Sequence, residues 1–479
     1  MTNNIFEQEL IFKNFKKISK IPHGSGNTKA ISDYCVEVAK KNNCSYVQDE
    51  ANNVIVYLDG TKGYEKSKSV ILQGHLDMVC EKTQDCDKNM ETDAIDILVD
   101  GDYIIADKTT LGGDDGIAVA YMLSLIEDKS IEHPPLELLF TTDEEIGMLG
   151  ATALNADLLN GKTLINIDSE EEGVLTVGCA GGVRAFCKIP FANEKCDGVG
   201  YKITVSGLRG GHSGVEINAG RTNAIKLIAR ILNHINQELS FKIASVEGGK
   251  AYNAIPKCAE AVICVSDTDK EKFLDAVQRF VDMIKFEKSN EPDLNISISQ
   301  VDNCKECMDA LSTKKIIFAL LLLPNGVQNF SPDIPEMVQT SLSLGNLKTN
   351  KSFIEMNILI RSNIATGKQA VVYKVKSFVE YLEGKVEFSS DYPAWEYKTI
   401  SPLRDIMAQT YNEMFGENVH ITAIHAGLEC GILSNKIKDI DIVSFGPDIL
   451  NIHTPKEKLD IKSVLRSWKY LKAVLKKLR

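Results

Sequence analysis

Residues 134–150, PPLELLFTTDEEIGMLG, carry an apolar run that passes directly into three consecutive acids. The run has the length and composition of a strand buried on both faces, which is typical of a sheet covered by helices. A single acidic cluster after such a strand is usually a solvated turn. Its meaning therefore depends on whether other strands of the same sheet also end in polar side chains.

The flanking sequence alternates between helical and strand patterns over the first 180 residues. Helices are expected at residues 12–21, 31–42 and 117–128, and strands at residues 52–58, 69–77, 135–142 and 163–168. This alternation predicts an α/β layer with a largely buried sheet. In such a layer, functional groups collect at the carboxyl ends of the strands.

A different pattern, β-α-β-β-α, begins near residue 186 and is repeated between residue 295 and about residue 390. From about residue 400 the first alternation returns. We therefore expect a catalytic domain formed by residues 1–186 and 401–479. Residues 187–400 would form an inserted α+β lid domain made of two similar halves that face each other.

Composition excludes several classes of protein. The 479 residues are too many for one compact core, because domains usually run about 100–200 residues. The net charge of −12 argues against nucleic acid as a partner, since phosphate binding needs a basic surface. The longest apolar run, IIFALLLLP at residues 316–324, is far shorter than the roughly 20 residues of a spanning helix, so no membrane partner is expected.

The start of the chain, MTNNIFEQEL, lacks a basic segment followed by an apolar one, so no secretory signal is expected. Twelve cysteines without a dense framework are typical of reduced thiols, which predicts a cytoplasmic protein. Cys304 and Cys307, in CKEC, have a metal-like spacing. Because no second pair accompanies them in the sequence, we interpret this pair as incidental.

Other strand ends do carry polar side chains. His75 and Asp77, in SVILQGHLDMV, are two residues apart at a strand end and so point to the same face. Asp114 and Asp115, in TTLGGDDGIAVA, lie between glycines just before a helix, where a helix N-cap explains Asp115 equally well. The remaining polar residues at strand ends or after turns are Glu144, Glu145, Asp168 and His453.

Two imidazoles and several carboxylates suit a pair of divalent ions such as zinc, with one carboxylate bridging them. Because Glu144 and Glu145 are adjacent, they cannot occupy the same position. One of them is expected to bind metal and the other to reach the water that the metal activates. Each motif alone is weak, and the prediction rests on their joint occurrence.

Seven motifs together resemble the di-zinc aminoacylase and carboxypeptidase superfamily: GHLDMV, LGGDDGIA, TTDEEIGMLGA, NIDSE, GGHSG, NAIP and FGPDILNIHTPKE. The double-length insert, GLECG and GGHSGVEI most resemble the bacterial aminoacyl-histidine (Xaa-His) dipeptidases, whose substrates include carnosine. The resemblance spans nearly the whole chain. It implies a zinc-peptidase catalytic domain of the phosphorylase/hydrolase-like α/β class with an inserted lid.

The resemblance also implies a role for each residue. His75 and Asp168 would complete one metal site, Glu145 and His453 the other, and Asp114 would bridge the two. Asp77 would orient His75, and Glu144 would act as general base. The peptide bond that matches Asp114–Asp115 is usually cis in the family. Zinc is the expected metal, with cobalt and manganese as alternatives.

Two residues of the insert match substrate-contacting residues of the family, and a third is predicted where the chain departs from the family pattern. His212 matches a lid histidine that stabilises the oxyanion, and Asn253 matches a residue that binds the substrate carboxylate. Many relatives have an arginine thirteen positions after that asparagine, where this chain has Ser266. We therefore predict that Arg361, at the equivalent strand position of the second half, binds the carboxylate of the dipeptide; a structural ion pair is the alternative.

The reaction implied is metal-dependent hydrolysis of the amide bond of Xaa-His and related dipeptides, with small peptides as the only partners. The alternatives are a related amidohydrolase, such as an N-acyl amino acid deacylase or a tripeptidase, and a non-catalytic metal-binding protein on the same fold. Either a monomer or a homodimer is compatible with the sequence. The repeated insert favours an active site complete in one chain.

Overall fold

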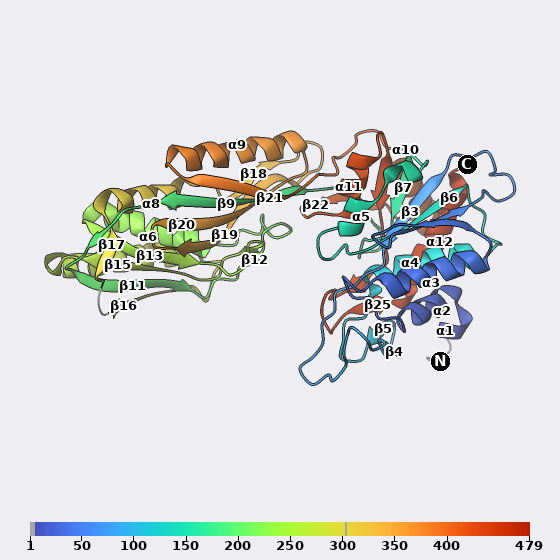
Figure 1. Cartoon of the computed structure of the whole chain (residues 1–479), viewed down its shortest axis with the longest axis horizontal. Coiled ribbons are helices and arrows are strands. Elements are labelled where there is room, and N and C mark those ends of the chain that lie inside the picture. The colour runs from blue at the N-terminus through green and yellow to red at the C-terminus, as the bar shows by residue number, and fades with distance from the viewer. Residues whose placement is uncertain (1–4, 302–303) are drawn as a thin grey trace. The chain divides into compact units, whose positions relative to one another are not determined.

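The computed structural model describes residues 5–301 and 304–479, so residues 1–4, which begin the stretch MTNNIFEQEL, lie outside the described part. The chain divides into two compact units. Unit 1 contains residues 1–179, 397–423 and 428–479, and unit 2 contains residues 180–396 and 424–427. The first and last parts of the chain therefore fold together, as the blue and red elements of unit 1 show (Figure 1).

The boundaries differ by a few residues from those expected at 186/187 and 400/401. Only Ala180 separates β8 (Val174–Cys179) from β9 (Gly181–Pro190), so no linker marks the change of unit in the sequence. The backbone N–H of Ala180 donates to the carbonyls of Ile424 and Ala426, at 3.1 and 2.9 Å. These bonds explain why residues 424–427 belong to unit 2.

Unit 1 is built on an eight-stranded sheet in the order β1-β2-β6-β3-β7-β23-β8-β22. The inner strands β6, β3, β7 and β23 are parallel to one another, so their carboxyl ends lie at one edge. The strands span β1 (Ser45–Gln48), β2 (Val54–Leu58), β3 (Val70–His75), β6 (Leu136–Thr141), β7 (Thr163–Asn166), β22 (His420–Ile424) and β23 (Asp441–Ser444). A smaller sheet contains β4 (Ile97–Asp100), β5 (Tyr103–Ala106), β24 (Ile449–Leu450) and β25 (Lys458–Asp460).

The helices of unit 1 confirm the predicted alternation. They span α1 (Ile5–Gln8), α2 (Leu10–Ile18), α3 (Lys29–Lys41), α4 (Gly113–Glu127), α5 (Leu149–Ala153), α10 (Pro402–Phe415), α11 (Glu429–Lys436) and α12 (Ile461–Lys477). Helix α4 is buried over almost its whole length, because it is apolar on nearly all sides. Its Tyr121 stacks on Trp468 of α12, with ring centroids 5.2 Å apart.

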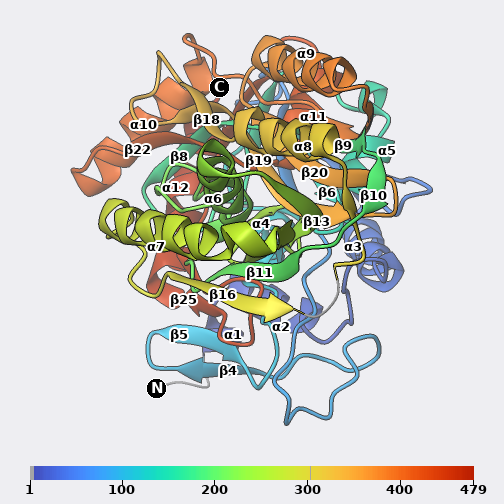
Figure 2. The same ribbon diagram turned by 90° about the vertical axis from the view of Figure 1, so that its left-hand side faces the viewer.

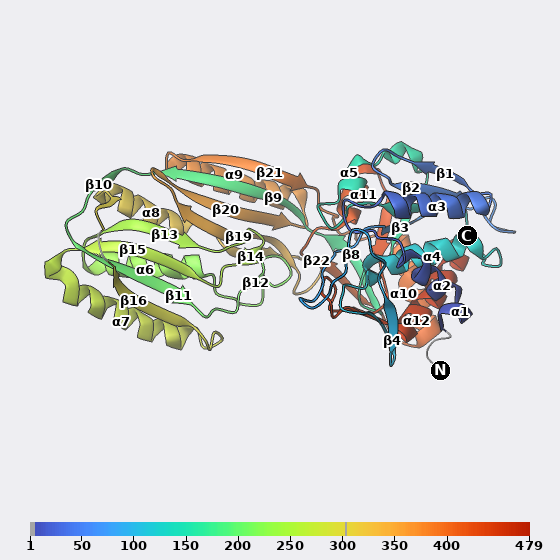
Figure 3. The ribbon, with the colours of Figure 1, turned by 60° about the horizontal axis from the view of Figure 1, so that its bottom comes forward.

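Unit 2 contains a nine-stranded sheet whose main path runs β16-β11-β15-β13-β19-β20-β9-β21, as Figure 3 shows, while β18 pairs with β19. These strands span β11 (Val199–Ser206), β13 (Phe241–Gly248), β15 (Ala259–Val265), β16 (Asn295–Val301), β18 (Gly326–Phe330), β19 (Val338–Thr349), β20 (Phe353–Ser362) and β21 (Lys385–Tyr392). Two short ladders pair β10 (Asn193–Lys195) with β17 (Glu306–Met308), and β12 (Gly211–His212) with β14 (Ala254–Ile255).

Four helices pack on this sheet: α6 (Ala224–Glu238), α7 (Lys270–Glu287), α8 (Ala310–Leu322) and α9 (Ala365–Tyr381). Figure 2 shows them following one another in the order α7, α6, α8, α9. The buried side chains of helices and strands form one continuous core, and strands such as β11 alternate buried and partly exposed residues. The apolar run at residues 316–324 lies mostly in α8, and no helix in the described residues is long and apolar enough to cross a membrane.

The two similar halves are present, but their arrangement differs from the expectation. They join side by side in one sheet, where Gly248 of β13 pairs with Leu347 of β19, instead of facing each other. The strand at residues 295–301, expected to open the second half, pairs with β11 and completes the first half. Strand β9, which precedes the first half in the chain, pairs with β20 and supplies the corresponding strand of the second half.

Candidate functional site

The carboxyl edge of the parallel strands in unit 1 brings the predicted ligand residues together. His75 is the last residue of β3, and the acids of DEEIG follow β6. Asp168 follows β7, and the segment FGPDILNIH with His453 follows β23. Because all four strands run in the same direction, these segments meet at one edge of the sheet.

Asp114 lies between the two imidazoles. Its Oδ1 is 3.1 Å from Nε2 of His75, and its Oδ2 is 3.1 Å from Nε2 of His453. His75 Nε2 also lies 3.4 Å from Asp168 Oδ1, and His453 Nε2 lies 2.7 Å from Glu145 Oε1. The structure thus places one imidazole and one carboxylate on each side of the Asp114 carboxylate, which the two sides share.

Asp77 holds the neighbouring backbone in place. His75 Nδ1 lies 2.9 Å from the main-chain carbonyl of Asp77 and 3.6 Å from its carboxylate, so the carbonyl provides the closer contact. The carboxylate instead accepts the backbone N–H groups of Glu144 and Glu145, at 3.0 and 3.3 Å, and the hydroxyl of Ser25 at 2.8 Å. Asp77 therefore ties the two adjacent glutamates to the histidine strand.

The turn after β6 depends on an unusual backbone conformation. Asp143 has a φ of 54°, in the left-handed region that non-glycine residues rarely adopt, and its carboxylate accepts the N–H of Gly26 at 2.7 Å. This turn directs the next two N–H groups of the chain toward Asp77. His453 also has a left-handed φ, of 59°, which is a feature that often marks functional sites.

The GGDDG segment at the start of α4 is held from two sides. The Asp114–Asp115 peptide bond is cis, as the resemblance implies. Asp114 and Asp115 depart from helical φ and ψ at the kinked start of α4, and no side chain among the described residues caps this helix start by a hydrogen bond, so the alternative of Asp115 as N-cap is wrong. The carboxylate of Asp115 instead accepts the N–H of His75 at 3.1 Å, and a Cβ at Gly74 would collide with it.

Glu457 is a residue that the sequence reasoning missed. Its carboxylate is 3% exposed and accepts the N–H groups of Leu111, Gly112 and Gly113 at 2.7, 3.1 and 2.8 Å. It therefore fixes the loop that carries Asp114. Its position in HTPKE, four residues after the predicted ligand His453, is the sequence feature that could have indicated a role at the site.

Glu429, in GLECG, has no role in the sequence prediction, but the structure buries it completely. Its Oε2 accepts hydrogen bonds from Gln73 and Thr141, both at 2.6 Å, and its Oε1 has no partner among the described residues. Burial raises the pKa of Glu429 to about 8. A protonated Glu429 would join the ends of β3 and β6 without adding charge.

The carboxyl edge of the unit 1 sheet holds more carboxylates than the positive charges of its histidines can balance. Burial raises the pKa of Asp168 to about 6, and burial with Asp168 and Glu429 raises that of Glu144 well above its ordinary value, against the effect of His75. Bound cations would relieve this repulsion. Imidazole nitrogens and carboxylate oxygens are also the donors that zinc and similar divalent ions accept, so the residues fit such a pair.

In unit 2, His212 lies in β12, and Asn253 directly precedes the paired strand β14. His212 pairs with Ala254 in the β12–β14 ladder, and the carbonyl of Asn253 accepts the N–H of Ser213 at 2.9 Å. The side chain of Asn253 is exposed. Burial and Arg361 both lower the pKa of His212, so its imidazole is neutral near pH 7.

The hydrogen bonds of His212 assign its tautomer. Nδ1 accepts the N–H groups of Gly214 and Val215, at 3.3 and 3.2 Å, so the hydrogen resides on Nε2. Nε2 lies 3.3 Å from Nη2 of Arg361, which is also a donor. Two donors that face each other in this way form a site for an anion, which would accept from both.

Arg361 is 5% exposed and lies at the end of β20. Its Nη1 donates to the hydroxyl of Tyr392 at 3.4 Å, and its Nε has no hydrogen-bond partner in the described residues. No carboxylate lies within 4.0 Å of it in the part of the chain that the structure describes, so the alternative of a structural ion pair is not observed. Burial lowers the pKa of its guanidinium, and a buried, unpaired cation is costly unless an anion binds it.

His425 is a second residue that the sequence reasoning missed. Its Nε2 lies 2.8 Å from the hydroxyl of Ser341, and its Nδ1 lies 3.0 Å from Oδ1 of Asn363. Burial, followed by Arg361, lowers the pKa of His425 to about 3. A neutral His425 adds no charge that would compete with an anion for Arg361.

Most of the chain is similar to known proteins. Residues 71–477 match the model of peptidase family M20/M25/M40. The chain is 36% identical to the cytosol non-specific dipeptidase of Escherichia coli K12 over 467 residues, which cover 97% of this chain and 96% of that protein.

Two solved structures are also similar. The aminoacylhistidine dipeptidase of Vibrio alginolyticus has 34% identity and a TM-score of 0.93, and the match covers 99% of this chain and 98% of that one. The aminopeptidase PepT of Bacillus cereus has 16% identity and a TM-score of 0.58, with 98% of both chains covered, which shows a shared fold alone.

Proposed function

Because the chain belongs to peptidase family M20/M25/M40, we propose that it is a metal-dependent dipeptidase that hydrolyses the amide bond of Xaa-His and related dipeptides. The observation that carries the proposal is Asp114, whose two carboxylate oxygens each face an imidazole nitrogen at 3.1 Å. The identity of 36% and 34% to two dipeptidases over nearly the whole chain supports the same substrate class.

The proposed metal ligands form two sets that share Asp114. His75 and Asp168 would hold one divalent ion, and Glu145 and His453 would hold the other. Zinc suits this donor set best, with cobalt and manganese as alternatives. When bound, such ions supply Lewis-acid chemistry that polarises a carbonyl and lowers the pKa of water.

The side chains of the chain itself move the proton and hold the substrate. Glu144 takes the proton from the attacking water and passes it to the leaving amine, and Asp77 keeps the Glu144 backbone in position. His212 donates its Nε2 hydrogen to the oxygen of the scissile carbonyl as negative charge develops. Arg361 binds the C-terminal carboxylate of the dipeptide, and Asn253 contributes to the same recognition.

The names of the two relatives bear on the breadth of the substrate range. One refers to aminoacyl-histidine and the other to a non-specific dipeptidase. We propose that the free carboxylate matters more than the histidine side chain, because the anion site at His212 and Arg361 recognises charge. We further propose a cytoplasmic protein, since the cysteines in the described residues are all free and one relative is named cytosolic. It would act as a monomer or a homodimer.

The substrate class is tested with the metal-loaded protein and a chelated control. We expect cleavage of carnosine, of an ordinary Xaa-His dipeptide and of a dipeptide without histidine, and no cleavage of an N-acetyl amino acid. The chelated protein should cleave none of them. Cleavage of the N-acetyl compound alone would move the function to a deacylase, and binding of two ions without any cleavage would favour a non-catalytic protein.

Replacing Glu457 with glutamine should weaken metal binding by about 10–100-fold, because an amide supplies one acceptor oxygen where the loop that carries Asp114 offers several N–H groups. The measurement is the zinc Kd by competition with a chelator. Lys456→Gln, which changes the exposed neighbouring residue, is the matched control and should keep the Kd of the parent. Equal affinities for both variants would show that Glu457 does not position the loop.

A further inference from the structure

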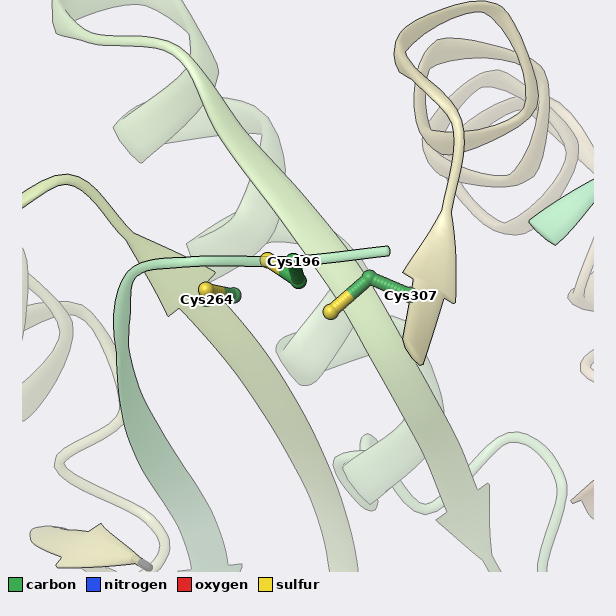
Figure 4. A group of neighbouring side chains, drawn as sticks. All are labelled: Cys196, Cys264 and Cys307. Carbon is green, nitrogen blue, oxygen red and sulfur yellow. The ribbon is translucent and has the colours of Figure 1, made fainter. Parts of the chain in front are cut away.

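Four cysteines of unit 2 lie close together in the structure, although they come from three segments that are far apart in the sequence. Cys264 lies in β15, Cys196 lies between β10 and β11, and Cys307 lies in β17, with Cys304 just before it. Figure 4 shows three of these side chains, each on a separate segment, with the sulfur of Cys307 directed toward the other two. The sequence offered only the C-x-x-C pair at residues 304–307, and the structure provides the partners that this pair lacked.

The sulfur atoms are close enough to share one ion. Those of Cys196, Cys264 and Cys307 all lie within 4.8 Å of one another. In a tetrahedral zinc site with Zn–S bonds of about 2.3 Å, neighbouring sulfurs are about 3.8 Å apart, so only small side-chain movements are needed. Cys304 packs against Cys264 and Cys307 and is 8% exposed. Its sulfur is not among those that lie within 4.8 Å of one another and donates to the carbonyl of Ile263 at 3.8 Å, so this side chain must turn to become the fourth ligand.

The backbone around the cluster is held by pairing. Glu194 pairs with Cys307 in the β10–β17 ladder, and the N–H of Cys196 donates to the carbonyl of Lys305 at 3.2 Å. The two segments are thus fixed to each other independently of the sulfur atoms. A preformed arrangement of this kind lowers the cost of bringing ligands to a metal.

Two glycines leave room for the sulfurs. A Cβ at Gly198 would lie 2.7 Å from Sγ of Cys264, and a Cβ at Gly200 would lie 2.8 Å from Sγ of Cys304. The backbone N–H of Gly198 also donates to the Cys264 sulfur. Backbone N–H groups directed at sulfur stabilise the thiolate, which is the form that binds metal.

The charge around the cluster also suits a metal thiolate. One divalent cation with four thiolates carries a net charge of −2, which a nearby cation offsets. Lys242 pairs with Cys264 across the β13–β15 ladder, and its Nζ lies 2.8 Å from Glu194. Because the same ammonium group is paired with the Glu194 carboxylate, it offsets the charge of the cluster only in part.

Ordinary core packing explains the four cysteines less well. Cysteines in a core behave as small apolar side chains, a role that does not by itself bring several of them to one place. Here Cys264, Cys304 and Cys307 form a cluster separate from the main core of unit 2, and Cys196 packs against it together with the apolar residues Ala244, Val262 and Val301. Four thiols therefore share one small cluster.

We propose that Cys196, Cys264, Cys304 and Cys307 bind one thiophilic divalent cation, with Zn²⁺ as the natural choice, at a site distinct from the carboxyl edge of unit 1. Binding converts four thiols to thiolates and releases their protons to the solvent. The ion has no open position for chemistry in such a site, and its role is structural. It fastens residues 304–307 and the β10–β11 connection to strand β15.

The test is zinc analysis of the full-length chain combined with X-ray absorption spectroscopy at the zinc edge. We expect three zinc ions per chain, and a sulfur shell at about 2.3 Å beside the shorter nitrogen and oxygen shell. Cys307→Ser should hold one zinc fewer and lose most of the sulfur shell. Cys258→Ser, which changes an exposed cysteine of the same unit, is the matched control and should retain both.

Other results separate this proposal from the proposed function. One zinc per wild-type chain with an all-sulfur shell would support the cysteine site and contradict the pair of ions in unit 1. Two zinc ions without any sulfur shell would overturn the cysteine site alone, as would a disulfide among these four residues in peptides mapped without reductant. Should Cys307→Ser fail to fold, the wild-type spectrum still decides, because it does not depend on the variant.

Discussion

Replacing Glu144 with glutamine should lower the turnover of dipeptides by about 10²–10⁴-fold while leaving the metal content unchanged, because glutamine keeps the size of the side chain but cannot accept a proton. The smaller effect corresponds to about 2.7 kcal/mol of transition-state stabilisation. The metal content should persist because the proposed ligands are other residues, and because Asp77 accepts the backbone N–H of residue 144 whichever side chain is present. Steady-state kinetics and zinc analysis of the same preparation provide the measurement.

The adjacent acid offers a matched control. Asp143→Asn makes the same change from carboxylate to amide one residue away, and asparagine tolerates the left-handed φ of this position. The Asp143 carboxylate binds the N–H of Gly26, a contact that an amide oxygen preserves, so turnover should stay within a few-fold of the parent. Normal turnover in Glu144→Gln, or an equal loss in both variants, would remove Glu144 from the role of general base.

The grouping of polar residues at the carboxyl edge of unit 1 could be predicted from the sequence because each strand end is marked by residues that are neighbours in the chain. Each buried strand appears as a short apolar run, and the polar residue that follows it, such as His75 after β3 or Asp168 after β7, marks where the strand ends. Parallel strands then bring those ends together without any need to know the strand order. The resemblance to a known family added the roles, which stay predictions until they are measured.

Features that depend on strand pairing were not predictable in the same way. Strand β9 pairs with β20 across more than 160 residues of chain, and this pairing assigns it to the second half of unit 2 instead of the first. The four cysteines show the same limit, because Cys264 meets Cys196 and Cys307 only through the registers of β15 and of the β10–β17 ladder. Glu457 escaped notice because its partners are backbone N–H groups, which no side-chain pattern reveals.

Arg361 offers a case in which stability and activity should move in opposite directions. The guanidinium is buried, and no carboxylate pairs with it among the described residues. In the absence of substrate, burying the guanidinium therefore costs desolvation free energy that few interactions offset. Replacing it with methionine, which keeps the length of the aliphatic stem, should leave the melting temperature unchanged or raise it. A structural ion pair would predict the opposite result, because its loss destabilises the fold.

The same Arg361→Met variant should lose about 10²–10³-fold in kcat/KM for dipeptides, because charge-assisted bonds to a buried carboxylate contribute about 2–5 kcal/mol. Dipeptide amides, which lack that carboxylate, should be affected far less, so the ratio of the two rates is the decisive measurement. Arg230→Met is the control, since Arg230 forms a surface ion pair with Glu287 at 2.8 and 2.6 Å in the same unit and should not alter kcat/KM. A lower melting temperature with equal losses on dipeptides and amides would make Arg361 a structural residue. A normal melting temperature with a selective loss on free dipeptides would identify it as the residue that recognises the substrate carboxylate.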